Sequence, residues 1–284
     1  MAKLYVSMQD CPTQERYHDF DKLLRLNLWS AKRDKPLKQE YLRDRLRNIK
    51  DIDSDNANIL CNHSRAAWEL FQNDESVMDS GLIVDFILDS SGYELFQDFC
   101  LADFLCKNTP VVKIRFHTKN IPWFIWNTTE NDMQHLLNRM KQMSKIYIQT
   151  LVARWINYIN EEKWQIVVRK FWCLPNEFSD MKNIDPWLYR TLSESTLIIM
   201  KGDINYLKAV GEFNWNPTLP LERVLDKFNP SNMLFVRVLR SDLICGLKET
   251  IAKRVETLNR HISKGSLGMI QFAAKAPEPP CLLE

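Results

Sequence analysis

The segment at residues 82–105, LIVDFILDSSGYELFQDFCLADFL, constrains the fold of this chain more than any other. Its apolar, β-branched start from Leu82 to Leu88 predicts a strand that is buried on both faces. Asp89-Ser90-Ser91-Gly92 has the composition of a turn, and apolar residues then recur at helical spacing. Asp89 therefore follows a buried strand at the end where open α/β sheets bind ligands. A helix cap is the simpler explanation of this carboxylate, so other segments must decide between the two.

The size and charge of the chain exclude several classes of protein. Its 284 residues suffice for one large domain or two modest ones. The 38 Lys and Arg residues nearly balance the 36 Asp and Glu residues, which leaves a net charge of +2. This balance gives no reason to propose nucleic acid or an acidic membrane surface as a partner. The glycine-rich motifs GxGxxG and GxxxxGK[ST], which cradle phosphates of dinucleotides and nucleoside triphosphates, are absent.

The seven cysteines indicate a reducing compartment. They are scattered without a CxxC pair, and no apolar signal segment precedes them, so we expect an intracellular, cytoplasmic protein. No apolar run approaches the ~18 residues of a membrane span, so we expect no membrane partner. Cys61 and His63 lack a second ligand pair at the spacing of a zinc site, and we attribute their proximity to chance.

Strands and helices are predicted to alternate after residue 80. Further strands are expected at residues 111–117, 196–200, 233–240 and 269–272, and helices at 133–143, 151–159, 188–192 and 219–228. Residues 121–129 read as a loop because of Pro122, and Thr128 or Thr129 is expected to cap the next helix. Residues 1–79 read as helical, including 23–29, 37–46 and 58–71. We therefore predict a small N-terminal helical subdomain (1–79) and an α/β domain (80–284) with a mainly parallel sheet.

Charged side chains follow several of these strands. Asp89 and Asp203 each stand just beyond a strand, Arg237 and Arg240 lie at the end of a third, and Lys264 lies in a later loop. Strand ends of a doubly wound sheet share one edge, so these groups are expected to converge. Two acids and several bases together suit a divalent metal and an anionic ligand such as phosphate.

Several spaced motifs give the chain a family resemblance. The motifs are LDSSGYELFQDFCLADFL, IPWFIWNTT, FWCLPNEF, KGDINYLK and VRVLRSD. In this order they resemble the damage-control phosphatases, in the branch also described as acidic-residue (protein-glutamate) carboxyl methyltransferases. The resemblance covers most of residues 20–274, and the N-terminal helical part is shorter than in the family.

The resemblance implies a fold and an activity. The fold is a three-layer α/β/α sandwich, and the activity is hydrolysis of phosphate monoesters of small metabolites, in this branch sugar phosphates such as fructose 1-phosphate. The cofactor implied is a divalent metal, manganese, nickel or cobalt. The methyltransferase activity is a weaker alternative, because nothing here resembles the glycine-rich loop of common methyl-donor sites.

The resemblance also implies roles for individual residues. Asp89 and Asp203 are the implied catalytic residues, and Asp89, Ser90 and Asn127 are the implied metal ligands. The implied substrate and phosphate contacts are Asp89, Ser90, Arg237, Val238, Leu239, Arg240, Ser241 and Lys264.

Several of these positions depart from the family pattern. Ser90 replaces an asparagine of the metal site, Asn127 replaces its second aspartate, and Trp126 replaces the serine before it. Arg240 replaces a lysine that holds substrate phosphate, and Leu207 replaces an arginine. Loss of a carboxylate weakens a divalent metal site. An alternative hypothesis is therefore a pseudoenzyme of the same fold that binds ligands without catalysis.

Overall fold

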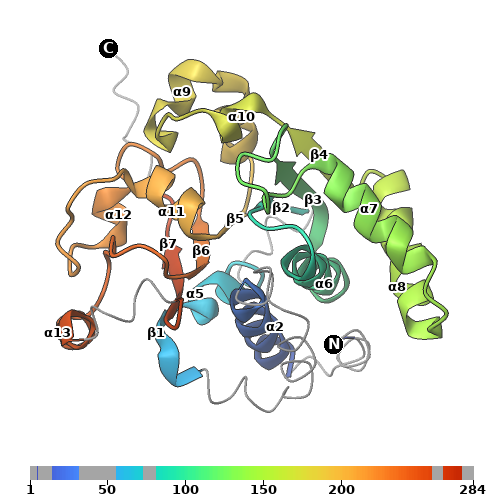
Figure 1. The fold of residues 1–284 in the computed structure, drawn as a ribbon, viewed down its shortest axis with the longest axis horizontal. Coiled ribbons are helices and arrows are strands. Elements are labelled where there is room, and N and C mark those ends of the chain that lie inside the picture. The colour runs from blue at the N-terminus through green and yellow to red at the C-terminus, as the bar shows by residue number, and fades with distance from the viewer. Residues whose placement is uncertain (1–4, 6–14, 32–55, 73–80, 258–264, 277–284) are drawn as a thin grey trace.

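A single seven-stranded sheet organises the chain (Figure 1). The computed structural model describes residues 5, 15–31, 56–72, 81–257 and 265–276. The strand order is β1-β7-β6-β5-β2-β3-β4, and every neighbouring pair is parallel except β6 and β7. The strands are β1 (Ile59–Asn62), β2 (Leu82–Ile87), β3 (Val111–Thr118), β4 (Trp164–Val168), β5 (Leu197–Lys201), β6 (Met233–Val238) and β7 (Gly268–Ala273).

Helices cover both faces of this sheet. The α-helices are α2 (Arg16–Ser30), α5 (Ser64–Glu69), α6 (Tyr93–Asn108), α7 (Glu130–Lys141), α8 (Ile146–Asn160), α9 (Met181–Ile184), α10 (Pro186–Ser193), α11 (Asp203–Val210), α12 (Leu221–Val224) and α13 (Glu249–Thr257). Short 3-10 turns are η2 (Asn56–Asn58), η3 (Lys170–Cys173) and η4 (Phe178–Asp180).

The alternation of side chains along the strands divides the core into two layers. Val84 and Phe86 of β2 pack with α2, α6 and α8 on one face. Ile198 and Met200 of β5 pack with α10 and α11 on the other face. Successive side chains of a strand point to opposite faces, so central strands that are apolar at every position serve both layers. The expected α/β/α sandwich with a mainly parallel sheet is confirmed.

The strand order reverses between β2 and β5. From β2 the chain continues outward through α6 to β3 and then β4, whereas β5 returns to the other side of β2 and continues to β6. In open α/β sheets, ligands bind in the crevice outside the carboxyl ends of strands at such a reversal. The residues that follow β2 and β5, which include Asp89 and Asp203, lie at this point.

Three sequence-based expectations differ from the structure. The helix expected at residues 58–71 is wrong in its first part, because residues 59–62 form β1 and only α5 is helical. The segment that begins at Trp164, for which no strand was predicted, forms β4 at the sheet edge. The helix expected at 219–228 is only α12, which starts after Pro220. Short edge strands carry too few residues for a clear pattern.

Some expectations fall outside the described residues. The helix expected at 37–46 and the side chain of Lys264 are among them. The division of the chain at residue 79 stays a prediction, although β1 lies before that boundary and pairs with β7. None of the helices that the structure describes has the length and hydrophobicity required to cross a bilayer.

Candidate functional site

The turn after β2 is held against the loop that precedes α7. Ser90 and Asn127 form an isolated antiparallel bridge. The Ser91 amide donates to the Trp126 carbonyl at 2.8 Å, and the Thr128 amide donates to the Asp89 carbonyl at 2.9 Å. The loop at 121–129 is non-regular as predicted, and a capping box of Thr129 and Asp132 starts α7. This backbone pairing brings Asp89, Ser90 and Asn127 together from two segments.

The Asp89 side chain is buried and faces Asn127. The Asn127 Nδ2 atom donates to Asp89 Oδ1 at 3.2 Å, while Asn127 Oδ1 accepts the Phe124 amide at 2.8 Å. The interpretation of Asp89 as a helix cap is wrong, since α6 begins after Gly92 without any side-chain cap. Gly202 completes the enclosure: a Cβ atom there would overlap the Asp89 carboxylate.

The protonation of Asp89 is shifted by this enclosure. Burial, reinforced by the nearby Glu94 charge, raises the pKa of Asp89 to about 6. Lys119, Lys201 and Arg240 oppose that shift through their positive charges. At neutral pH the group is therefore an anion whose charge is only partly compensated.

A network of buried polar side chains lies close to Asp89 and includes Glu94 and Lys201, whose charges act on it. Lys201 Nζ donates to Glu94 Oε1 at 2.7 Å and lies 3.5 Å from Asp98 Oδ1. Asn27 of α2 donates to Asp98 at 2.6 Å, so the network ties α2 to the centre of the sheet. Burial raises the pKa of Asp98 to about 7, and the Lys201 charge opposes this. The sequence analysis missed these groups because nothing in helical spacing distinguishes a buried acid from an exposed one.

Asp203 forms an ion pair instead of facing Asp89. Its Oδ1 atom accepts Arg237 Nη1 at 2.9 Å, and both side chains are buried. The guanidinium also donates to the Leu243 carbonyl at 2.8 Å, and its carbon lies 3.5 Å from the centre of the Tyr206 ring. Asp203 and Arg237 therefore pair with each other, and the catalytic role of Asp203 and the phosphate-binding role of Arg237 stay predictions.

The other predicted substrate contacts are only partly brought together. Val238 and Leu239 are buried in two apolar clusters, and their role as substrate contacts stays a prediction. Arg240 is close enough to lower the pKa of Asp89 and donates to the Ala31 carbonyl, beyond the end of α2, at 3.0 Å. Lys264 lies outside the described residues.

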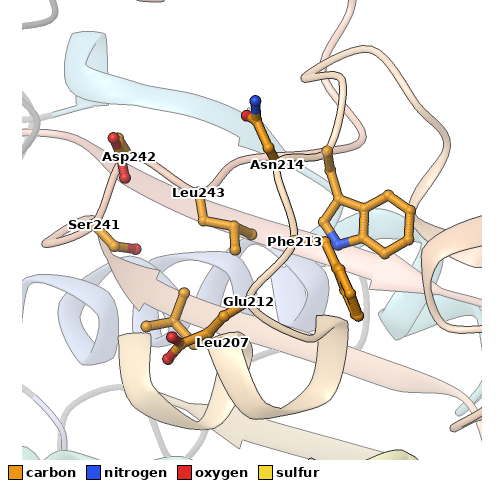
Figure 2. A pocket seen from close by; sticks show the side chains of 8 residues that line it. Leu207, Glu212, Phe213, Asn214, Ser241, Asp242 and Leu243 are labelled. Carbon is orange, nitrogen blue, oxygen red and sulfur yellow. The ribbon is translucent and has the colours of Figure 1, made fainter.

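Ser241 lines a pocket between α11 and the segment after β6 (Figure 2). The pocket has a volume of about 360 Å³. Glu212, Phe213 and Asn214 bound it from the segment after α11, and Asp242 and Leu243 lie opposite. Leu207, at the position of a family arginine, contributes an apolar side chain to its base.

Two lysines that the sequence analysis did not single out also lie at this edge of the sheet. Lys119 follows β3, is buried, and donates to the Leu88 carbonyl at 3.4 Å. Lys208 of α11 donates to the Leu174 carbonyl at 2.7 Å. Lys208 belongs to the motif KGDINYLK, which was the available sequence signal.

The residues implied as metal ligands do not form an open ligand set. One Asp89 oxygen accepts the Asn127 amide, and the Asn127 oxygen is used by the Phe124 amide. Ser90 Oγ is directed at the remaining Asp89 oxygen, 3.4 Å away. The part of the chain that the structure describes contains no group of three or more His, Cys, Asp or Glu side chains able to hold a metal ion. As arranged here, these residues do not fit a divalent cation.

Fold and site together define an α/β protein with a buried carboxylate and several cations at the sheet reversal. The chain belongs to the family of the damage-control phosphatase ARMT1-like domain, whose model matches residues 2–255. It is 33% identical over 257 residues to the damage-control phosphatase ARMT1 of Mus musculus, covering 89% of this chain and 58% of that protein. The Homo sapiens protein of that name is 31% identical over 251 residues, covering 87% and 57%.

The comparisons extend over most of this chain but only part of its relatives. The chain spans roughly three-fifths of the curated relatives that it matches. Among solved structures, a DUF89 family protein from Pyrococcus horikoshii aligns with 94% of this chain and 76% of its own. That alignment has 12% identity and a TM-score of 0.44.

Proposed function

We propose that this protein acts on small phosphorylated metabolites, with the phosphate group bound beside Asp89. Family membership favours hydrolysis of phosphate monoesters as the reaction. The observation that supports the position is the group of cations around the sheet reversal, namely Lys119, Lys201 and Arg240, whose charges all reach Asp89. Cationic side chains supply charge-assisted hydrogen bonds to phosphate oxygens.

Sugar phosphates such as fructose 1-phosphate are the substrates that we propose to test first. The pocket beside Ser241 supports this choice, because carboxylate, amide and hydroxyl groups line it together with aromatic rings. Hydroxyl-rich ligands use such hydrogen-bonding groups. The five described cysteines are all free thiols, which supports an intracellular location.

A second candidate function is ligand binding without hydrolysis. The hydrogen bond from Asn127 to Asp89 favours it, because the Asp89 carboxylate is held by a neutral amide donor and not by a cation. The metal dependence implied by the resemblance, on manganese, nickel or cobalt, requires Asn127 to release Asp89. The two candidates share the phosphate site and differ in turnover.

One experiment separates these candidates. Phosphate release from a panel of sugar phosphates is measured with the purified protein, with manganese, nickel or cobalt and with a chelator. Turnover that needs metal and disappears in Asp89→Ala supports the phosphatase. If folded protein releases no phosphate but binds the same compounds in calorimetry, the result supports ligand binding without hydrolysis and contradicts the phosphatase. If it neither releases phosphate nor binds any compound, both candidates are wrong.

A further inference from the structure

Lys119 and Lys208 lie on the same side of the sheet reversal. The Leu88 carbonyl accepts hydrogen bonds from Lys119 Nζ at 3.4 Å and from Asn205 Nδ2 at 3.3 Å, so Lys119 reaches α11. Asn205 and Lys208 are three residues apart in α11 and share one face of that helix. The charge of Lys119 acts on Lys208: together with burial it lowers the pKa of Lys208 to about 8.

Neither amine has an ion-pair partner among the described residues. Lys119 is 3% exposed, and its only side-chain hydrogen bond to a residue of the described ranges is the long one to Leu88. Lys208 Nζ has its carbonyl partner and lies over three aromatic rings, 5.3 Å from the centres of Trp123 and Phe178 and 5.8 Å from that of Phe171. A buried lysine is ordinarily paired, so the closed Lys119 amine beside the half-buried Lys208, neither with a described carboxylate at ion-pair distance, indicates an anion that binds between them.

Other charged groups near Lys119 and Lys208 do not supply the missing anion. Asp89 and Glu94 both act on Lys119. Glu94 is already paired with Lys201, and the charge of Asp89 also interacts with Lys201 and Arg240. Cys173 lies near both lysines and is held through its Sγ contact with the Ile121 carbonyl at 3.6 Å.

We propose that Lys119 and Lys208 form the subsite for the anionic group of the ligand, with the Trp123 ring as its wall. The proposal rests on the proposed function, because it assigns the phosphate of that ligand to two residues from different elements. Arg237, committed to Asp203, is then a structural residue. Lys208 is half-buried and reaches solvent, whereas Lys119 forms the closed end.

Calorimetric binding of inorganic phosphate and of fructose 1-phosphate to the full chain tests this subsite. The variants are Lys119→Met, Lys208→Met and the charge-retaining Lys208→Arg. Lys163→Met is the matched control: Lys163 Nζ also contacts a carbonyl, that of Cys106 at 3.4 Å, and lies 5.1 Å from the Tyr158 ring centre. It stands just before β4, at the opposite end of the strands.

We expect both methionine variants to weaken binding of either compound by about tenfold or more, the usual effect of losing one charge-assisted hydrogen bond. Lys163→Met is expected to stay within about twofold of the wild type, and Lys208→Arg to retain most of the affinity. If Lys119→Met does not fold, Lys208→Met decides alone.

Two other outcomes distinguish failure of the lysine subsite from failure of the proposed function. If the wild type binds both compounds and Lys208→Met binds them as well as Lys163→Met does, the lysine subsite is wrong and the proposed function stands. If the folded wild type binds neither compound, the subsite is overturned together with the proposed function.

Discussion

The side-chain amide of Asn127 donates a hydrogen bond to the carboxylate of Asp89 across 3.2 Å. An aspartate at position 127 would instead place a second negative charge beside Asp89, and a cation would be needed to hold the two together. The Asn127 nitrogen atom therefore stands where the aspartate implied by the family resemblance would place an anionic oxygen.

The double substitution Asn127→Asp with Ser90→Asn is expected to create a metal site. Even in bulk water, the added carboxylate stabilises a bound divalent cation by about 1 kcal/mol per unit of cation charge. The double variant should therefore bind manganese at least about tenfold more tightly than the wild type does. Titration calorimetry with manganese measures this, followed by phosphate release from fructose 1-phosphate. Asn157→Asp is the control, since Asn157 also donates to a carboxylate, that of Glu161 at 2.8 Å, on the remote helix α8. Equal manganese affinity in both variants would contradict the prediction.

Asp89→Asn is expected to stabilise the protein at neutral pH. The pKa of Asp89 is raised by burial from 3.8 to about 6, so the folded state binds its proton more tightly than the unfolded state does. The contribution of Asp89 to the free energy of unfolding is therefore highest below pH 4. It falls by about 3 kcal/mol in total as the pH rises to 6. Urea unfolding at pH 4 and pH 7 should show a gain for Asp89→Asn at pH 7 only. A gain of equal size at both values would refute the assigned shift.

Gly202→Ala is expected to destabilise the fold by more than backbone strain accounts for. Gly202 has φ +82°, which already costs a side chain about 1 kcal/mol or more, and a Cβ atom there would overlap the Asp89 carboxylate. Gly265→Ala provides the comparison, because Gly265 has φ +65° but its nearest neighbouring atom is 3.3 Å from the Cβ position. The difference between the two unfolding free energies measures the close approach of β5 to Asp89. Similar losses would mean that the carboxylate moves aside freely.

Arg237→Met is expected to cost about 3–5 kcal/mol, because it leaves Asp203 as a buried charge without its cation. Adding Asp203→Asn to that variant should recover part of the loss. Lys253→Met removes the cation of an exposed pair with Glu249 in α13 and should cost less than about 1 kcal/mol. Chemical unfolding of the three variants measures these values. A double variant no more stable than Arg237→Met would argue that the pair is not the source of the loss.

The central strands and the Asp89 turn were predictable because their signals are local. A continuous apolar run from Leu82, a turn and a helical repeat specify one strand–turn–helix unit. Strand β1 was hidden, because Ile59 to Asn62 are four residues inside a stretch with helical composition. Its pairing with β7 depends on contacts that lie far away in the sequence.

The partners within the site were harder to predict than its location. Strand ends placed Asp203 and Arg237 at the same edge as Asp89, but their own ion pair depends on side-chain direction. Lys119 and Lys208 carry no distinguishing pattern, since lysine is usually exposed and only tertiary packing buries Lys119 and half-buries Lys208. Local sequence thus located the edge of the sheet, and packing decided which charges meet there.

The pairing of β1 with β7 has a consequence for synthesis on the ribosome. Ile59 lies opposite Gly268, so β1, which is synthesised before the other strands of this sheet, is completed by β7, which is synthesised after them. Until that strand emerges, β1 is an edge with unpaired amide and carbonyl groups, the kind of segment that associates with other chains. Folding of this sheet edge is therefore expected to wait until β7 has been synthesised, and a pause in translation between the two strands would prolong the period in which the nascent chain is open to aggregation.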